Sequence, residues 1–453
     1  MHENSPKKIP QNYKYQSLTE QKQQSAIQVS ENDQSEIQEK KNISQKKDQI
    51  NSESDVEIYQ LNQKSVKNIK PLIIRSLFIS FGAIYTGYIL GSYSFVQPTM
   101  KYVLDNDSGY IDGLCNALVT IGTGIGSFLA NYLLNQKVKK RRTCIIIADL
   151  IGLLACFLQM IPSLWFLMPG RLLGGIASGF NFLICPIYIK EFVPIEYLGT
   201  CISMYSNSVN IGVMFSYIVG FTLHEDVSKN VPFIWRLNLA FPILFLIIRF
   251  IAINMFYKLD TPAYYFEQND QKSAKQAMLQ TYDKESLQNA IQFYLDQMKQ
   301  VEQTKVEMKQ LLSPQYRKRF LMAMFSSASE ALSGLMIFTA YSWMIYGNVV
   351  KSQNLNTALC VTQVIIQMLG TAILVIDLVP QSGVSCANAF MAFFNSIYSF
   401  GFPVLIDNGV PLWSGLSIIV ICDVFLLLIF KFWVIETKGL TETQLNQIFS
   451  KVK

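Results

Sequence analysis

The chain has 453 residues, of which 50% are hydrophobic, 13% aromatic and only 15% charged. A soluble protein of this length would carry more charge, so the composition indicates a membrane protein, and the net charge of +6 does not by itself indicate a nucleic-acid partner. The eight cysteines form no CxxC pair, and the two histidines form no cluster. We therefore expect reduced packing cysteines, no metal site and no cofactor. The sequence has no nucleotide-binding loop and no catalytic triad motif, so we expect no enzyme activity.

The first 70 residues differ from the rest of the chain. They are rich in Gln, Lys, Glu, Asn and Ser and contain few large apolar residues. Such a segment cannot bury enough apolar surface to offset the entropy lost on ordering. We therefore predict a disordered cytosolic tail over residues 1–70.

Long apolar runs follow, and a helix needs about 20 apolar residues to cross a bilayer. These runs predict ten membrane helices, at about 71–100, 111–134, 143–163, 165–190, 199–223, 233–257, 319–347, 355–378, 384–406 and 411–435. The polar segment 258–318 interrupts them and has a helical pattern. We therefore expect an all-α polytopic membrane protein with a six-helix bundle (71–257), a cytosolic helical insert (258–318), a four-helix bundle (319–436) and a short tail (437–453).

The distribution of basic residues predicts the orientation. The loop 135–142, "NQKVKKRR", carries five Lys and Arg residues, and "YRKRF" precedes the seventh predicted helix. The loops on the other side contain few bases. Cytoplasmic loops carry an excess of Lys and Arg, so both termini are predicted to be cytosolic, in the plasma membrane or an endomembrane.

The fourth predicted helix is rich in small residues, in "GRLLGGIASGF". Small residues let helices pack closely in lipid, so Gly175 and Gly179 are expected to form a packing face. Pro186 should loosen the last turns, and Glu191 follows at the membrane edge near the basic loop. An ordinary interfacial glutamate is an equally open interpretation of Glu191.

Together these residues follow the pattern GR…GxAxG…PxYxxExxPxExxG, which resembles the sugar porters of the major facilitator superfamily. Shorter segments resemble the same family in the right order: "TGYILG" (86–91), "WRLNLAFP" (235–242), "LDTPAYYF" (259–266) and "IETKGLTE" (435–442). The resemblance implies two pseudo-symmetric bundles around a midplane site with alternating access. It therefore implies a transporter of a hexose or a similar small polar solute.

The resemblance also suggests which residues act. A cytosolic latch would comprise Arg141, Arg142, Glu191, Asp260, Asp377 and Glu436. The substrate-binding positions would be Ser206, Glu330, Tyr341, Gln367 and Asn395.

Several positions depart from the family pattern. Leu198 and Ala263 stand where the family has arginines of the latch. Tyr85 replaces the aspartate of proton-coupled members and cannot cycle a proton near neutral pH. Facilitated diffusion is therefore favoured over proton coupling. Between Asp377 and Ala387 there is no room for the family's ninth and tenth helices.

These departures keep an alternative function open. The chain could be a degenerate, non-transporting relative that acts as a sensor, scaffold or subunit, with a membrane protein partner at the shortened second bundle. A third interpretation is that the sequence belongs to a twelve-helix transporter and lacks one segment of it.

Three carboxylates fall within apolar runs: Asp149, Glu330 and Asp423. Ionisable groups in the membrane are costly and are usually paired or functional. Glu330 could recognise substrate or couple protons, or it could be a protonated acid bonded to serines of its own helix. Arg249 could pair with one of these acids, or it could snorkel to the interface.

Overall fold

The computed structural model describes residues 69–295, apart from 106–107, 136–139, 224–225, 231–232, 283, 285–286, 289 and 293. It also describes residue 313, residues 317–371 apart from 333, 349 and 351, and part of 393–421. The predicted latch residues Asp377 and Glu436 lie outside the described residues, as do Asp423 and the segment 372–392.

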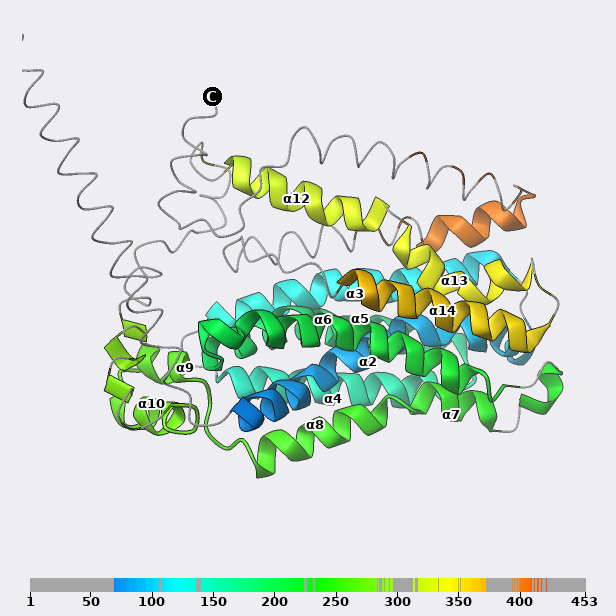
Figure 1. Cartoon of the computed structure of the whole chain (residues 1–453). Helices are drawn as coiled ribbons and strands as arrows, with labels where there is room; N and C mark the ends of the chain where they lie inside the picture. Colours follow the sequence, from blue (N-terminus) through cyan, green and yellow to red (C-terminus); the bar gives the residue numbers. More distant parts are fainter. Residues whose placement is uncertain are drawn as a thin grey trace, which may run out of the picture. The chain divides into compact units, whose positions relative to one another are not determined.

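The described part is mainly helical, and no β-strand occurs in it. The first half of the chain forms α2 (Ile69–Val103), α3 (Gly109–Asn135), α4 (Arg141–Gln159), α5 (Leu164–Phe192), α6 (Ile195–Gly220), α7 (Ile234–Ala240) and α8 (Ile243–Met255) (Figure 1). A short 3₁₀ turn, Val227–Asn230, precedes α7. These helices coincide with the first six predicted spans, and α7 and α8 together form the sixth.

The structure corrects the seventh predicted span, which we expected as one helix over 319–347. Two helices occupy it, α12 (Arg317–Leu332) and α13 (Leu335–Gly347). Gly334 lies between them with a φ of 68°, in the left-handed region that glycine adopts without a steric penalty. The prediction was wrong because apolar length alone does not show where a chain breaks.

Three described helices remain, two in the insert and one in the eighth predicted span. The polar insert begins with α9 (Pro262–Glu267) and α10 (Gln271–Met278). The eighth predicted span begins with α14 (Gln353–Thr371). Among the described helices, five stretches are long and apolar enough to cross a membrane: Ile69–Val103, Gly109–Leu134, Arg141–Gln159, Leu164–Phe192 and Ile234–Met255.

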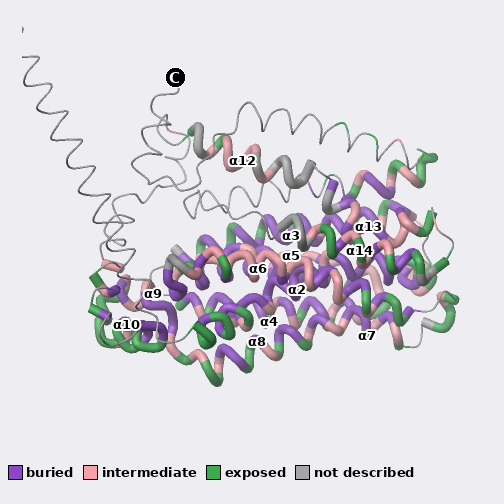
Figure 2. The backbone as a smooth tube through the Cα atoms, in the orientation of Figure 1, coloured by how far each residue is buried: buried purple, intermediate pink, exposed green. Residues whose placement is uncertain are grey.

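Close helix packing in the first half depends on glycines. A Cβ atom at Gly175 would overlap the carbonyl oxygen of Val119, and one at Gly179 would overlap that of Thr123. Both contacts are with the α3 backbone, so α3 and α5 touch without side chains between them. Buried residues accordingly follow the inner faces of these helices (Figure 2). Pro186 lies inside the last turns of α5.

Replacing Gly179 with alanine is expected to destabilise the protein, by about 1–3 kcal/mol as for other overpacked sites. The backbone carbonyl of Thr123 cannot move aside as a flexible side chain would. Gly199 in α6 is the matched control, because nothing lies within 4 Å of a Cβ built there, and alanine is the better helix former. Thermal unfolding in detergent should therefore show a lower midpoint for Gly179→Ala but not for Gly199→Ala. Equal midpoints for the two variants would contradict the role of this contact.

Candidate functional site

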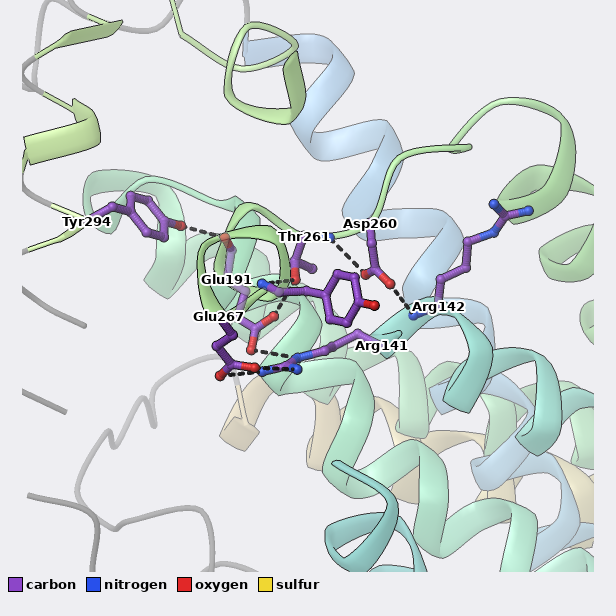
Figure 3. A network of polar contacts seen from close by, with 8 residues as sticks. Arg141, Arg142, Glu191, Asp260, Thr261, Glu267 and Tyr294 are labelled. Carbon is purple, nitrogen blue, oxygen red and sulfur yellow. Dashed lines mark hydrogen bonds and ion pairs between the residues drawn. The ribbon is translucent and has the colours of Figure 1, made fainter. Parts of the chain in front are cut away.

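A network of charged groups lies where α4 begins and α5 ends (Figure 3). Arg141 is the first residue of α4, and its guanidinium donates to both carboxylate oxygens of Glu267, at 2.9 and 3.0 Å. Its Nε also donates to Glu191 at 3.2 Å. Paired donors in this fork geometry make arginine–carboxylate contacts both strong and directional. Arg141 therefore joins α4, α5 and α9 at one point.

Glu191 binds partners on both sides of its carboxylate. One oxygen accepts from Arg141, and the other accepts from the hydroxyl of Thr261. Thr261 is also the N-cap of α9, where its side chain accepts from the N–H of Tyr264. The hydroxyl of Tyr294 donates to the backbone carbonyl of Glu191. The insert is thus fixed to the end of α5 by several bonds.

Asp260 accepts a second set of hydrogen bonds in the same region. Its carboxylate accepts from the backbone N–H groups of Arg142 (3.2 Å) and Thr261 (2.8 Å). Burial raises the pKa of the Asp260 carboxyl above its ordinary value, while these N–H donors and the nearby charges of Arg141 and Arg75 oppose that rise. The Arg142 guanidinium turns away and binds Asn254 (2.7 Å) and the Lys258 carbonyl (3.0 Å).

Arg75 also belongs to this region, although the sequence analysis missed it. It is buried in α2, and its guanidinium stacks over the rings of Phe192, Tyr257 and Tyr188 at 4.7, 5.1 and 5.2 Å. It donates to the Tyr188 hydroxyl and to the Leu259 carbonyl. No local motif marks Arg75, since its partners come from distant segments.

The structure brings four of the predicted latch residues together: Arg141, Arg142, Glu191 and Asp260. Sequence reasoning did not find Glu267, whose only signal is its position as the first carboxylate after the "LDTPAYYF" motif. Leu198, which replaces a family arginine, is instead buried in a hydrophobic cluster with Tyr188 and Tyr205. Glu267 thus supplies the network with a carboxylate that the motif comparison did not include.

A second charged pair lies within the helices of the first half. Arg249 of α8 and Asp149 of α4 are fully buried, and both Nε (2.8 Å) and Nη2 of Arg249 donate to one Asp149 oxygen. Arg249 also donates to Asn181 of α5 at 2.8 Å. A side chain at Gly82 of α2 would overlap the guanidinium. Of the two interpretations left open, pairing is therefore confirmed and snorkelling was wrong.

Tyr85 lies in the hydrophobic core of the first half. It is fully buried in a cluster with Cys156, Ala177 and Leu246, and its hydroxyl has no hydrogen-bond partner among the described residues. Tyr85 therefore packs as an aromatic residue of the hydrophobic core. Nearby, Arg171 donates to the Cys115 and Ile89 carbonyls and to Asn116.

The predicted substrate positions fall on several elements. Tyr341 in α13 is buried and donates to the carbonyl of Ser399, one turn after the buried Asn395. Ser206 and Gln367 are half-buried on α6 and α14, two helices that pack together. Glu330 lies on α12, and the surroundings of its side chain are outside what the structure describes. The structure thus brings Tyr341 next to the segment that holds Asn395.

The arrangement of helices defines a class of protein. It is similar to inward-open, partially occluded XylE, the xylose transporter of E. coli, with a TM-score of 0.64, 16% identity, and coverage of 82% of this chain and 100% of that chain. A second structure, of the proton:xylose symporter XylE bound to 6-bromo-6-deoxy-D-glucose, gives a TM-score of 0.66, 17% identity, and coverage of 84% and 100%. The fold is therefore that of the major facilitator superfamily.

Sequence comparisons place the chain in one family within this superfamily. The family model for "sugar (and other) transporter" matches residues 72–380, and the chain belongs to this family. It is 23% identical over 321 residues to hexose transporter 1 of Plasmodium vivax, covering 65% of this chain and 63% of that protein. It is 24% identical over 311 residues to facilitated glucose transporter member 8 of Bos taurus, covering 66% and 59%. The chain thus spans less than two thirds of the length of either relative.

Proposed function

We propose that the protein is a multi-pass membrane transporter of the sugar porter type, which carries a hexose or a similar small polar solute by facilitated diffusion. Membership of the sugar transporter family over residues 72–380 is the observation that supports this most strongly. Relatives named as hexose or glucose transporters support the substrate class. The comparisons do not favour the alternative of a non-transporting sensor or scaffold.

The proposal of facilitated diffusion rests on Tyr85. Its ring is enclosed by hydrophobic neighbours, and a tyrosine hydroxyl, even with the usual pKa of about 10 in water, does not exchange protons near pH 7. Transport should therefore follow the sugar gradient without a proton gradient.

The charged network would then be the cytosolic latch. The bonds of this network join α4, α5 and the insert, through Arg141, Arg142, Glu191 and Asp260. They would hold this end of the first half rigid. The positive-inside rule supports a cytosolic position for this end and for both termini. Glu330 as a further substrate contact, and a membrane protein partner at the second bundle, stay predictions.

Uptake into proteoliposomes tests the proposed function. Purified protein should take up radiolabelled D-glucose faster than L-glucose, and an uncoupler should leave the initial rate unchanged. Liposomes without protein measure leakage. Equal uptake of the two enantiomers, at the rate of empty liposomes, would reject hexose transport. Uptake that collapses with the uncoupler would reject facilitated diffusion only.

A further inference from the structure

Asn116 of α3 has a buried side-chain amide whose orientation is set by its neighbour. Its Oδ1 accepts from Nη2 of Arg171 at 3.0 Å. A guanidinium has donors only, so the amide oxygen faces Arg171 and the amide nitrogen points away from it. That nitrogen, Nδ2, has no hydrogen-bond partner among the described residues, although the side chain is buried. Buried polar groups without a partner are rare, which makes Nδ2 a candidate donor to a ligand.

Arg171 is itself fixed by groups of the first half. Its Nε donates to the carbonyl of Cys115 at 3.2 Å, and its Nη1 donates to that of Ile89 at 3.1 Å. The guanidinium also lies over the ring of Tyr93, 5.0 Å from the ring centroid. The first half alone therefore sets the direction of the Asn116 amide. The positive charge on the oxygen side polarises this amide, which strengthens the N–H groups of Nδ2 as donors.

Asn116 lies on the face of α3 that meets the second half of the chain. Three residues earlier on this face, a Cβ atom at Gly113 would overlap the carbonyl oxygen of Phe400. The side chain of Asn116 interacts electrostatically with the hydroxyl of Tyr341, although Nδ2 is outside hydrogen-bonding geometry. Tyr341, where the backbone of α13 is irregular, donates to the carbonyl of Ser399. Asn116 is thus placed beside two elements of the second half.

The second half contributes acceptors at the same junction. The Oδ1 of Asn395 and the hydroxyl of Ser399 are buried and have no hydrogen-bond partner among the residues that the structure describes. These two residues are four apart in α-helical conformation, so they lie on one face. A sugar hydroxyl accepts from one group and donates to another. A donor on the first half and acceptors on the second are therefore complementary to such a hydroxyl.

We propose that Asn116 is a specificity-determining residue that donates from Nδ2 to one hydroxyl oxygen of the transported sugar. Arg171 is the positioning residue that presents this donor, and Asn395 and Ser399 accept from the sugar on the other side. The expected substrate is therefore a neutral, polyhydroxylated solute. This inference rests on the proposed function, because it assumes that the solute carried has hydroxyl groups.

The test reverses the direction of the hydrogen bond. Asn116→Asp keeps the shape of the side chain and an oxygen for Arg171, but replaces the amide donor with an acceptor. The adjacent guanidinium favours the ionised form of the new carboxylate. The probes are D-glucose analogues in which one hydroxyl at a time is replaced by fluorine, which accepts but does not donate, or by hydrogen. Each analogue competes with radiolabelled D-glucose for uptake into proteoliposomes, which gives its inhibition constant, KI.

The effect should be confined to one carbon of the sugar. There, the wild type should bind the fluoro analogue more tightly than the deoxy analogue. In the Asn116→Asp protein the KI of this fluoro analogue, relative to that of D-glucose, should rise roughly fivefold, the factor for one hydrogen bond. Asn116→Leu, which has a similar shape and no polar atom, should abolish the difference between the fluoro and deoxy analogues at that carbon.

Asn181→Asp is the matched control. The Oδ1 of Asn181 accepts from the buried Arg249 at 2.8 Å, and its Nδ2 has no partner among the described residues. Asn181 therefore repeats the arrangement of Asn116, but its neighbours Arg249 and Gly82 belong to the first half. This variant should leave the KI ratio of every analogue as in the wild type.

The inference is overturned if the Asn116→Asp protein takes up glucose with wild-type KI ratios at every carbon. It is also overturned if Asn181→Asp changes the ratios in the same way, since the effect would then be one of general packing. A wild-type protein that takes up no sugar would reject the proposed function, and this inference with it. Uptake with unchanged ratios would reject this inference alone.

Discussion

Replacing Arg249 with methionine is expected to destabilise the protein by about 3–5 kcal/mol, the usual effect of removing one partner from a buried ion pair. The change would leave the charge of Asp149 fully buried without its partner. Thermal unfolding in detergent, together with the yield of monodisperse protein, measures the effect.

Two further variants separate the ion pair from general packing. The double variant Asp149→Leu with Arg249→Met should recover most of the loss, because apolar groups of similar volume can replace a buried pair without a large penalty. Arg236→Met is the control for removing a guanidinium: Arg236 is half-buried and stacks over Trp235 at 5.2 Å. A double variant no more stable than Arg249→Met would show that the two charges are not coupled.

Replacing Arg141 with glutamine should weaken the charged network. We expect the free energy of unfolding to fall by about 1.5–3 kcal/mol, the usual contribution of a hydrogen bond to a charged group. The change removes the paired bonds to Glu267 and the bond to Glu191. The start of α4 should then separate from α5 and α9 more often. Maleimide labelling of Cys144, which is fully buried one turn after Arg141, measures this separation.

Arg142→Gln is the matched control for this prediction. Its guanidinium binds the neutral groups of Asn254 and Lys258, while the bond to Asp260 comes from its backbone N–H and survives the change. We expect a smaller increase in Cys144 labelling for Arg142→Gln than for Arg141→Gln. The role assigned to the Glu267 contact would be wrong if the two variants behaved alike.

Much of the fold could be predicted because its signals are local. Apolar runs of membrane length located the six spans of the first half, since a helix in lipid satisfies its own backbone within the run. The break at Gly334 and the irregular turn at Tyr341 could not be placed in this way. Tyr341 lies inside the mostly apolar run 335–346, where hydropathy changes little, and the serines and the glutamate before Gly334 lower the hydropathy without showing where the helix ends.

The candidate site also contains residues that local motifs predict and residues that they do not. Motif spacing pointed to Arg141, Arg142, Glu191 and Asp260, because each stands in a short pattern that resembles the family. Glu267 and Arg75 stand in no such pattern. They reach the network only because α2 begins and α9 ends beside the end of α5, and no local window of sequence contains these three segments.

The sequence by itself determined that this is a helical membrane protein of the sugar transporter family, and it predicts that the basic loops lie on one side of the membrane. Length, hydropathy and short motifs carry that information along the chain. Only the tertiary structure decided that Arg249 pairs with Asp149, that Arg141 takes Glu267 as a second partner, and that Arg171 binds Asn116. Each of these contacts joins residues far apart in the chain. Which partner a buried charge or backbone group takes depends on helix packing, because burial removes water as the alternative partner.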